Sequence, residues 1–257
     1  MRSNGGLIGA KKTVSPTSAS GIWAIRDVQR EKGAGNWSAP TTRRGLILEL
    51  DAGNSSSYPG SGSTWYDISG NGLNATFVNG TPSFSSSNGG KLQFAADTTY
   101  AQVTTSSLFA VGTGDYSVDM WVLLPNSSAV YNHYFGMPDQ ASGRIWKSAD
   151  DANNTIYFYD GSNSLLYGAT NFNVPPGTWR HIGITRTSGV FKGYTNGVER
   201  GSVSSSHTLS SNSVRVRPFI NVEYEVTHIT SCRFYNVGLT AAEMMHNYSV
   251  HATRHGL

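Results

Sequence analysis

The sequence contains a single cysteine, Cys232, so no disulfide can form within the chain. Charged residues make up only 14% of the 257 residues. No apolar run approaches the roughly 20 residues that a membrane-spanning helix requires, and the first residues lack the apolar segment of a signal peptide. We therefore expect a soluble protein that is made in a cytoplasm and does not insert into a membrane.

What the chain has in abundance is turn-forming residues. It contains 29 glycines together with many serines, threonines and asparagines, and aromatic residues make up 11%. This composition is typical of many short strands joined by turns, with enough aromatic residues to fill a core. It predicts an all-β fold, with one large β domain favoured over two small ones. Cys232 lies in an alternating run and is expected to be a small, half-buried strand residue.

Charge divides the chain into parts. Residues 1–44 hold eight basic and two acidic residues, a net charge of +6, whereas the remainder holds eleven basic and fourteen acidic residues, a net charge of −3. This asymmetry predicts that a basic N-terminal arm, residues 1–44, has a different role from the rest of the chain. We expect the arm to serve for attachment, with a β domain at 45–250 and a C-terminal tail at 251–257. Because the domain is net negative, nucleic acid is not an expected partner of the domain. The arm could contact nucleic acid, and docking on an acidic protein shell fits its charge equally well.

Strand and turn patterns recur from Gly45 onward. Strand patterns are predicted at 46–50, 91–94, 100–103, 116–122, 155–159, 179–185, 190–194, 214–217 and 229–235. Asn196-Gly197 predicts a tight hairpin turn. One helix is predicted at Thr240–Tyr248, where Thr240 and Glu243 form a capping box.

Four blocks resemble the laminin-G type of concanavalin-A-like jelly roll, in the order that family shows. They are the opening segment Gly45–Phe84, the strand Tyr116–Val122, the segment from Trp179 to Gly197, and the closing strand and helix Ser231–Tyr248. The resemblance implies a jelly-roll sandwich with an extended N-terminal arm and one short C-terminal helix. It also implies that Gly45–Phe84 is the first hairpin and that Trp121 and Trp179 fill the sandwich core.

The arm is similar to N-terminal segments of structural proteins in tailed phages of marine bacteria. That resemblance rests on Gly-Gly-Leu-Ile-Gly, a later Ser-Gly-Ile-Trp and a second tryptophan. An isolated arm buries too little apolar surface to order itself. The candidate anchors, for a partner or for the arm's own domain, are Trp23, Ile25, Trp37, Arg43 and Arg44.

The chain lacks the carboxylate pattern that glycoside hydrolysis needs, although glucanases share this fold. The nearest approach is Glu223-Tyr224-Glu225, which has no third acid and no central aspartate. We therefore expect no enzymatic activity and no catalytic residue.

Calcium is the candidate ligand among metals. Ca²⁺ takes oxygen ligands from loop aspartates and asparagines, and jelly rolls of this type often hold one ion at the rim. Asp67, Asn71 and Asp97 are the candidates. The alternative is that Asp67 accepts hydrogen bonds from its own turn backbone.

Glycan binding would use exposed aromatic and amide side chains in rim loops. The candidate contacts are Tyr58, Trp65, Tyr131, His133 and Tyr134, and the alternative is that these side chains line the core. The favoured interpretation is a non-enzymatic virion protein of a tailed phage, a capsid decoration protein assembled into an oligomer or lattice. Its partners would be capsid or tail proteins and host-surface glycans. The alternatives are a receptor-binding module of a tail fibre and, third, a degenerate glycoside hydrolase.

Overall fold

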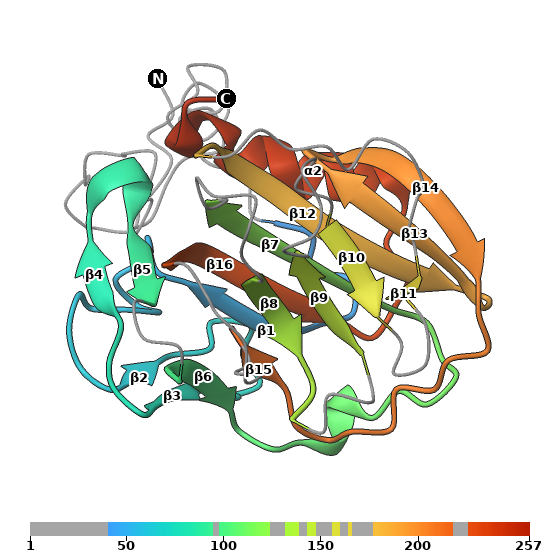
Figure 1. Ribbon diagram of the computed structural model, residues 1–257, viewed down its shortest axis with the longest axis horizontal. Helices are drawn as coiled ribbons and strands as arrows, with labels where there is room; N and C mark the ends of the chain where they lie inside the picture. The colour runs from blue at the N-terminus through green and yellow to red at the C-terminus, as the bar shows by residue number, and fades with distance from the viewer. Residues whose placement is uncertain are drawn as a thin grey trace, which may run out of the picture. The chain divides into compact units, whose positions relative to one another are not determined.

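The computed structural model describes residues 41–94, 98–123, 132–138, 143–147, 156–159, 164–165, 177–217 and 226–257. The chain divides into two compact units, Met1–Thr41 and Thr42–Leu257. The boundary therefore lies three residues before the predicted end of the arm at residue 44. All helices and strands below belong to the second unit (Figure 1).

The second unit is built from two antiparallel sheets of eight strands each, which confirms the predicted all-β sandwich. In spatial order the first sheet contains β14 (Val198–Ser204), β13 (Val190–Thr195), β12 (Trp179–Thr187), β7 (Tyr116–Leu123), β16 (Thr227–Tyr235), β5 (Lys91–Phe94) and β4 (Ser83–Ser85), with β1 (Leu46–Asp51) also paired to β16. The second sheet contains β11 (Ser164–Leu165), β10 (Ile156–Tyr159), β9 (Arg144–Lys147), β8 (Asn132–Gly136), β15 (Arg215–Val216), β6 (Tyr100–Val103), β3 (Ala75–Val78) and β2 (Thr64–Trp65).

The main core lies between the two sheets. Alternate residues of β7 point into it, as predicted: Tyr116, Val118, Met120 and Val122 all belong to the core cluster. Cys232 is also there and is fully buried, and burial raises the pKa of its thiol well above the usual value. It is therefore a core residue with no accessible thiolate.

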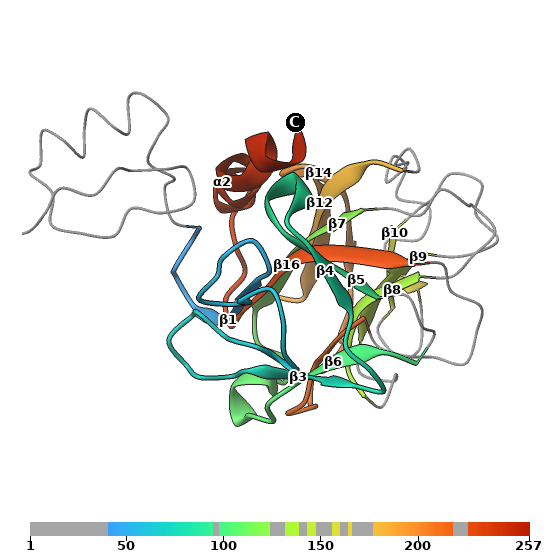
Figure 2. The same ribbon diagram turned by 90° about the vertical axis from the view of Figure 1, so that its left-hand side faces the viewer.

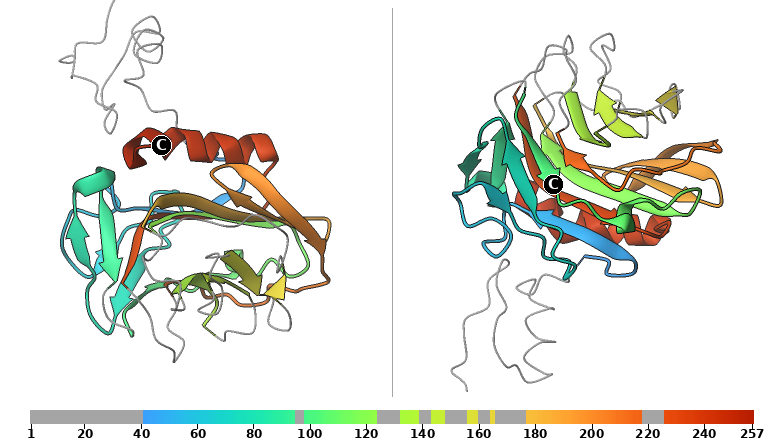
Figure 3. Two further views of the ribbon diagram at one scale, coloured as in Figure 1. Left: turned by 45° about the horizontal axis from the view of Figure 1, so that its top comes forward. Right: turned by 90° about the horizontal axis from the view of Figure 1, so that it is seen from below.

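A third layer covers the outer face of the first sheet, the face turned away from the second sheet. Helix α2 (Ala241–Ala252) lies across it and continues into the short helix η3 (Thr253–His255) (Figure 3). Strands β8, β9 and β10 lie on the opposite side of that sheet from α2 (Figure 2). The predicted capping box is confirmed, because the Thr240 hydroxyl accepts from the N–H of Glu243 and the Glu243 carboxylate accepts from the N–H of Thr240.

Two details of the predicted fold are wrong. Gly45–Phe84 is not one hairpin, because β1 pairs with β16 in the first sheet while β2 and β3 pair within the second. Trp121 and Trp179 do not fill the sandwich core; they pack with Ala252 of α2 in a separate cluster. The side chains of β7 alternate between the two faces of the sheet. Met120 therefore points into the main core, and Trp121 points to the opposite face, toward α2.

The predicted turn at Asn196-Gly197 joins β13 to β14, with positive φ angles of 50° and 74° at its two residues. Short 3-10 helices occur at Ser87–Gly89 (η1) and Ser107–Phe109 (η2). Within the described residues, no helix is long and apolar enough to cross a membrane.

Candidate functional site

A buried ionic cluster lies between the first sheet and α2. Nη1 of Arg233 donates to Oδ1 of Asp119 at 2.6 Å, and its Nε donates to Oε1 of Glu49 at 3.2 Å. Nδ2 of Asn247 on α2 donates to the second oxygen of Asp119 at 2.7 Å, and Nε2 of His181 lies 3.3 Å from the first. Burial alone would raise the pKa of Asp119, but Arg233 and His181 hold it well below its usual range.

Such perturbed groups can mark an active site, but this cluster is closed. Asp119, Arg233, His181 and Asn247 are each 0% exposed. No substrate can reach them while α2 is in place, so we interpret the cluster as the device that fastens α2 to the sheet.

The C-terminal residues 251–257 extend this attachment and are not the tail that the sequence predicted. Both terminal nitrogens of Arg254 donate to the Asp51 carboxylate, and the ring of His255 stacks on Trp121 with centroids 4.1 Å apart. Burial would raise the pKa of Asp51, yet Arg254 lowers it to about 2. The helical segment continues from α2 through η3 and ends at Gly256, whose φ of 75° is left-handed.

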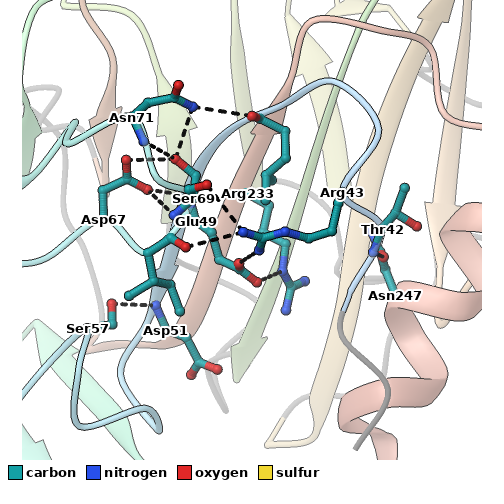
Figure 4. A network of polar contacts seen from close by, with 12 residues as sticks. Thr42, Arg43, Glu49, Asp51, Ser57, Asp67, Ser69, Asn71, Arg233 and Asn247 are labelled. Atoms are coloured by element: carbon teal, nitrogen blue, oxygen red, sulfur yellow. Dashed lines mark hydrogen bonds and ion pairs between the residues drawn. The ribbon is translucent and has the colours of Figure 1, made fainter.

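The predicted calcium loop is held together by its own hydrogen bonds (Figure 4). The Asp67 carboxylate accepts from the backbone N–H groups of Glu49 at 2.9 Å, Ser69 at 2.9 Å and Leu73 at 3.0 Å. It also accepts from the Ser69 hydroxyl at 2.8 Å. The carboxylate therefore shapes the turn, as the alternative interpretation predicted.

Asn71 presents the wrong end of its amide for a cation. Its Nδ2 donates to the carbonyl oxygen of Ile47 at 2.9 Å, so in this arrangement Asn71 acts as a donor and not as an oxygen ligand. The described residues contain no group of three histidine, cysteine or acidic side chains arranged to hold a metal ion. Asp97, the third candidate, lies outside the described residues.

Two of the predicted partner anchors are bound to the domain itself. Nη1 of Arg43 lies 2.5 Å from the Glu49 carboxylate, and Arg44 makes two hydrogen bonds to Glu243, at 2.7 and 2.8 Å. The hydrogen bonds from Arg44 help lower the pKa of Glu243 to about 2. Both arginines therefore fix the start of the second unit to its sheet and helix.

The predicted glycan contacts are interior residues wherever the structure describes them. Tyr58 is 2% exposed, Trp65 and Tyr134 are 0% exposed, and all three belong to the main core; His133 is 3% exposed. The prediction that they form a surface site is wrong, because their side chains are buried in the interior of the sandwich domain. Several other predicted residues lie outside the described part of the chain: Trp23, Ile25, Trp37, Tyr131, Glu223 and Glu225.

A row of side chains that the sequence patterns did not reveal lies on the outer face of the second sheet. Strand register places Tyr159 opposite Arg144, Arg144 opposite Gly136, Gly136 opposite Arg215, and Arg215 opposite Gln102. The residues next to them in each strand point into the core. The row therefore faces outward and crosses five strands.

Within this row, arginines lie on aromatic rings. The guanidinium carbon of Arg144 is 4.4 Å from the ring centre of Tyr159, and that of Arg215 is 4.4 Å from the ring centre of Tyr100. Nε of Arg215 also donates to Oε1 of Gln102 at 2.8 Å. These contacts hold the long side chains flat along the sheet.

The electrostatics of the second sheet are one-sided. None of its described strands contains an aspartate or glutamate, whereas strands of the first sheet contain Glu49, Asp51, Asp119 and Glu199. Near the row, burial first and then the charges of Arg144 and Arg217 lower the pKa of His133 to about 3. His133 is therefore neutral at pH 7, and the positive charge of this face is carried by arginines.

The outer row was not recognised because its members lie far apart in the sequence. The alternation of Val214-Arg215-Val216-Arg217 gave the only local signal, and it indicates a strand without saying what lies beside it. Register between strands is what brings Arg144 and Arg215 to either side of Gly136, a position without a side chain.

Solved structures with the same fold come from an enzyme domain and from toxins. Domain 4 of AbnA, an extracellular arabinanase of Geobacillus stearothermophilus solved with arabinotriose, is 19% identical, with a TM-score of 0.58 over 78% of this chain and 96% of that one. The binding domains of botulinum neurotoxin serotypes D and G are 15% and 17% identical, with TM-scores of 0.56 and 0.58 over 80% and 81% of this chain. This chain covers only about half of those toxin domains, 52% and 51%.

No curated protein sequence matches the chain. A family does match, over residues 95–244, which is more than half of the 257 residues. The matched segment contains most strands of both sheets and the first turn of α2. The chain therefore belongs to the concanavalin A-like lectin/glucanases superfamily.

Proposed function

We propose that the protein is a non-enzymatic lectin-like module that binds a glycan on the outer face of its second sheet. The observation that carries this proposal is the row Tyr159–Arg144–Gly136–Arg215–Gln102. Aromatic rings offer flat apolar faces on which sugar rings stack, while guanidinium and amide groups bind hydroxyl oxygens in fixed directions. The glycine in the middle leaves room between the two arginines.

The row contributes basic and neutral groups, whereas glycoside hydrolysis requires a pair of carboxylates. Absence of hydrolysis is therefore part of the proposal. If the protein hydrolyses any glycan at a low rate, replacing Glu223 and Glu225 by glutamine should leave that rate unchanged. A loss of activity in that variant would support the degenerate hydrolase instead.

A carbohydrate microarray probed with the full-length protein tests the binding proposal. We expect reproducible binding of a small group of glycans with dissociation constants on the order of micromolar. Tyr159→Ala should weaken that binding about tenfold, because the stacking surface is lost, and Tyr159→Phe should retain most of it. No binding to any glycan, or equal loss in both variants, would contradict the proposal.

We further propose that the module is displayed on the virion of a tailed phage, on the capsid in preference to a tail appendage, as part of an oligomer or lattice. The observation that favours this role is the charge of the N-terminal segment, because residues 1–41 have a net charge of +4 and the remainder of the chain has a net charge of −1. A basic segment is suited to docking on an acidic protein shell.

Deletion of residues 1–41 tests the display proposal. The boundary matters, because removing Arg43 and Arg44 as well would also break their contacts with the domain. The shortened protein should remain folded and soluble and should no longer bind to particles in a co-sedimentation assay. If it still bound, attachment would lie elsewhere.

A further inference from the structure

A second polar site lies at one end of the first sheet, away from the row described above. The turn between β12 and β13, the end of β14 and the loop before β7 surround an open pocket of about 600 Å³. It is lined by Arg186 and Gly189 and by the hydroxyl-bearing residues Thr113, Ser188 and Ser204–Ser206. Apart from the arginine, every side chain that lines it is small and uncharged.

Arg186 is a buried cation with an uncommon set of partners. The residue is only 3% exposed, and its Nη1 donates to the carbonyl oxygens of Thr113 and Gly114, the latter at 2.9 Å. Its Nε has no hydrogen-bond partner. Within the described residues no carboxylate forms an ion pair with it, and its guanidinium carbon lies 5.7 Å from the ring centre of Phe191.

The second terminal nitrogen of Arg186 lies beside the pocket lining. A Cβ atom built on Gly189 would stand 3.9 Å from Nη2 and 3.7 Å from the carbonyl oxygen of Ser205. Both separations are ordinary van der Waals contacts, and the φ of 80° at Gly189 is what disfavours a side chain there. The backbone therefore leaves the approach to Nη2 clear.

A buried guanidinium without a counter-charge is costly, and a bound anion would offset that cost. The surrounding hydroxyl groups add donors of the kind that complete the coordination of an oxyanion. One carboxylate borders the site: Oδ1 of Asp115 accepts from the N–H of Ser188 at 2.8 Å. That hydrogen bond fixes the turn, and it leaves Arg186 without an acidic partner.

We infer that this pocket binds a small oxyanion, a carboxylate or a sulfate, with Arg186 as the charged partner and the hydroxyl groups of Ser188 and Ser204–Ser206 as neutral donors. Two sources carry that chemistry: an acidic sugar, or an inorganic anion free in solution. The inference does not depend on glycan binding by the second sheet, because the pocket is built from the first sheet and its loops.

Amide chemical shifts of the full-length, isotope-labelled protein test this inference. Sodium glucuronate and sodium sulfate should each be titrated, with glucose as the neutral control. We expect saturable shifts at Ser188, Gly189 and Ser205 with one or both anions and none with glucose. Saturation by glucuronate alone identifies an acidic sugar as the ligand, and saturation by sulfate identifies inorganic anions; either result supports the inference.

Variants at exposed serines separate the pocket from general charge effects. Ser206→Glu places a negative charge at the pocket and should weaken anion binding at least about tenfold. Ser202→Glu, on β14 but outside the lining, should leave binding unchanged. Arg215→Gln should also leave it unchanged. Equal shifts with glucose, shifts that do not saturate, or equal weakening by both glutamates would overturn the inference.

Discussion

On the outer face of the first sheet Arg233 is fully buried and bonded to two carboxylates, whereas on the outer face of the second sheet Arg215 lies over Tyr100 and bonds a neutral amide. The first face is covered by α2. Both carboxylate oxygens of Asp119 accept hydrogen bonds there, one from Arg233 and the other from Asn247 of α2. The second face has no acidic residue in its described strands.

This contrast separates two uses of polar residues in one sandwich. A buried ion pair beneath a helix costs desolvation energy, and it fixes the position of the helix on the sheet. Arginines that lie on aromatic rings at an outer face present a planar guanidinium in a fixed orientation. The difference predicts that substitutions on the first face change stability, while substitutions on the second face change binding.

The largest effect is expected from Asp119→Ala. The substitution leaves Arg233 buried with one carboxylate fewer and removes a partner of Asn247 on α2, so unfolding should require about 4 kcal/mol less free energy. Urea unfolding followed by circular dichroism measures the change. Arg215→Gln on the second face is the matched control and should cost at most about 0.5 kcal/mol. Equal losses would remove the distinction between the two faces.

Deleting residues 251–257 comes next. The deletion removes the Arg254–Asp51 ion pair and the stacking of His255 on Trp121, and we expect a loss of about 3 kcal/mol. Thermal unfolding of the shortened protein measures it. An unchanged midpoint would mean that these residues behave as the loose tail that the sequence predicted.

Acid should weaken the first face in two steps. Burial first and then Arg233 lower the pKa of His251 to about 3, so the unfolded chain takes up this proton near pH 6.5 and the folded chain does not. Stability therefore falls as the pH drops below 6.5, by about 2 kcal/mol at pH 5 from this residue alone. Asp51, with its pKa lowered to about 2, contributes stability above pH 4 that is lost as the pH falls toward 2.

His251→Gln should remove this residue's share of the first step and leave the second step unchanged. The pKa of His255 is also lowered to about 3, chiefly by burial, so His255 contributes to the same first step. Urea midpoints between pH 7 and pH 3 measure both. His133 on the second sheet has the same direction of shift, so His133→Gln serves as the comparison for that face. A pH profile that neither variant changes would contradict the assignment of the acid sensitivity to these histidines.

Local sequence patterns predicted much of the fold. Alternation gave the bounds of β5 and β6 correctly, and the pair Thr240 and Glu243 marked the start of α2. Alternation says which residues share a face, but not which face meets the main core. Both faces of β7 are buried, one in the core and one under α2, so Trp121 was assigned to the wrong layer.

The candidate site could not be predicted in the same way. Arg144 and Tyr159 lie in consecutive strands, but Gln102 and Arg215 lie in strands distant from these and from each other along the chain, and only strand register brings all four together. In contrast, the aromatic residues that stood out in the sequence, such as Trp65 and Tyr134, are buried in the core, because their large apolar surfaces are stabilised there. In this sequence, the aromatic residues predicted to contact a glycan are core residues wherever the structure describes them.

One paired measurement tests the central claim most directly. Glycans bound by the wild-type protein should be titrated against Arg215→Gln on the second sheet and Lys192→Gln, an exposed position of the first sheet that pairs with Glu199. We expect Arg215→Gln to weaken binding about tenfold and Lys192→Gln to leave it unchanged. Equal binding by both variants, or no glycan bound by the wild type, would contradict the claim that the second sheet carries the binding face.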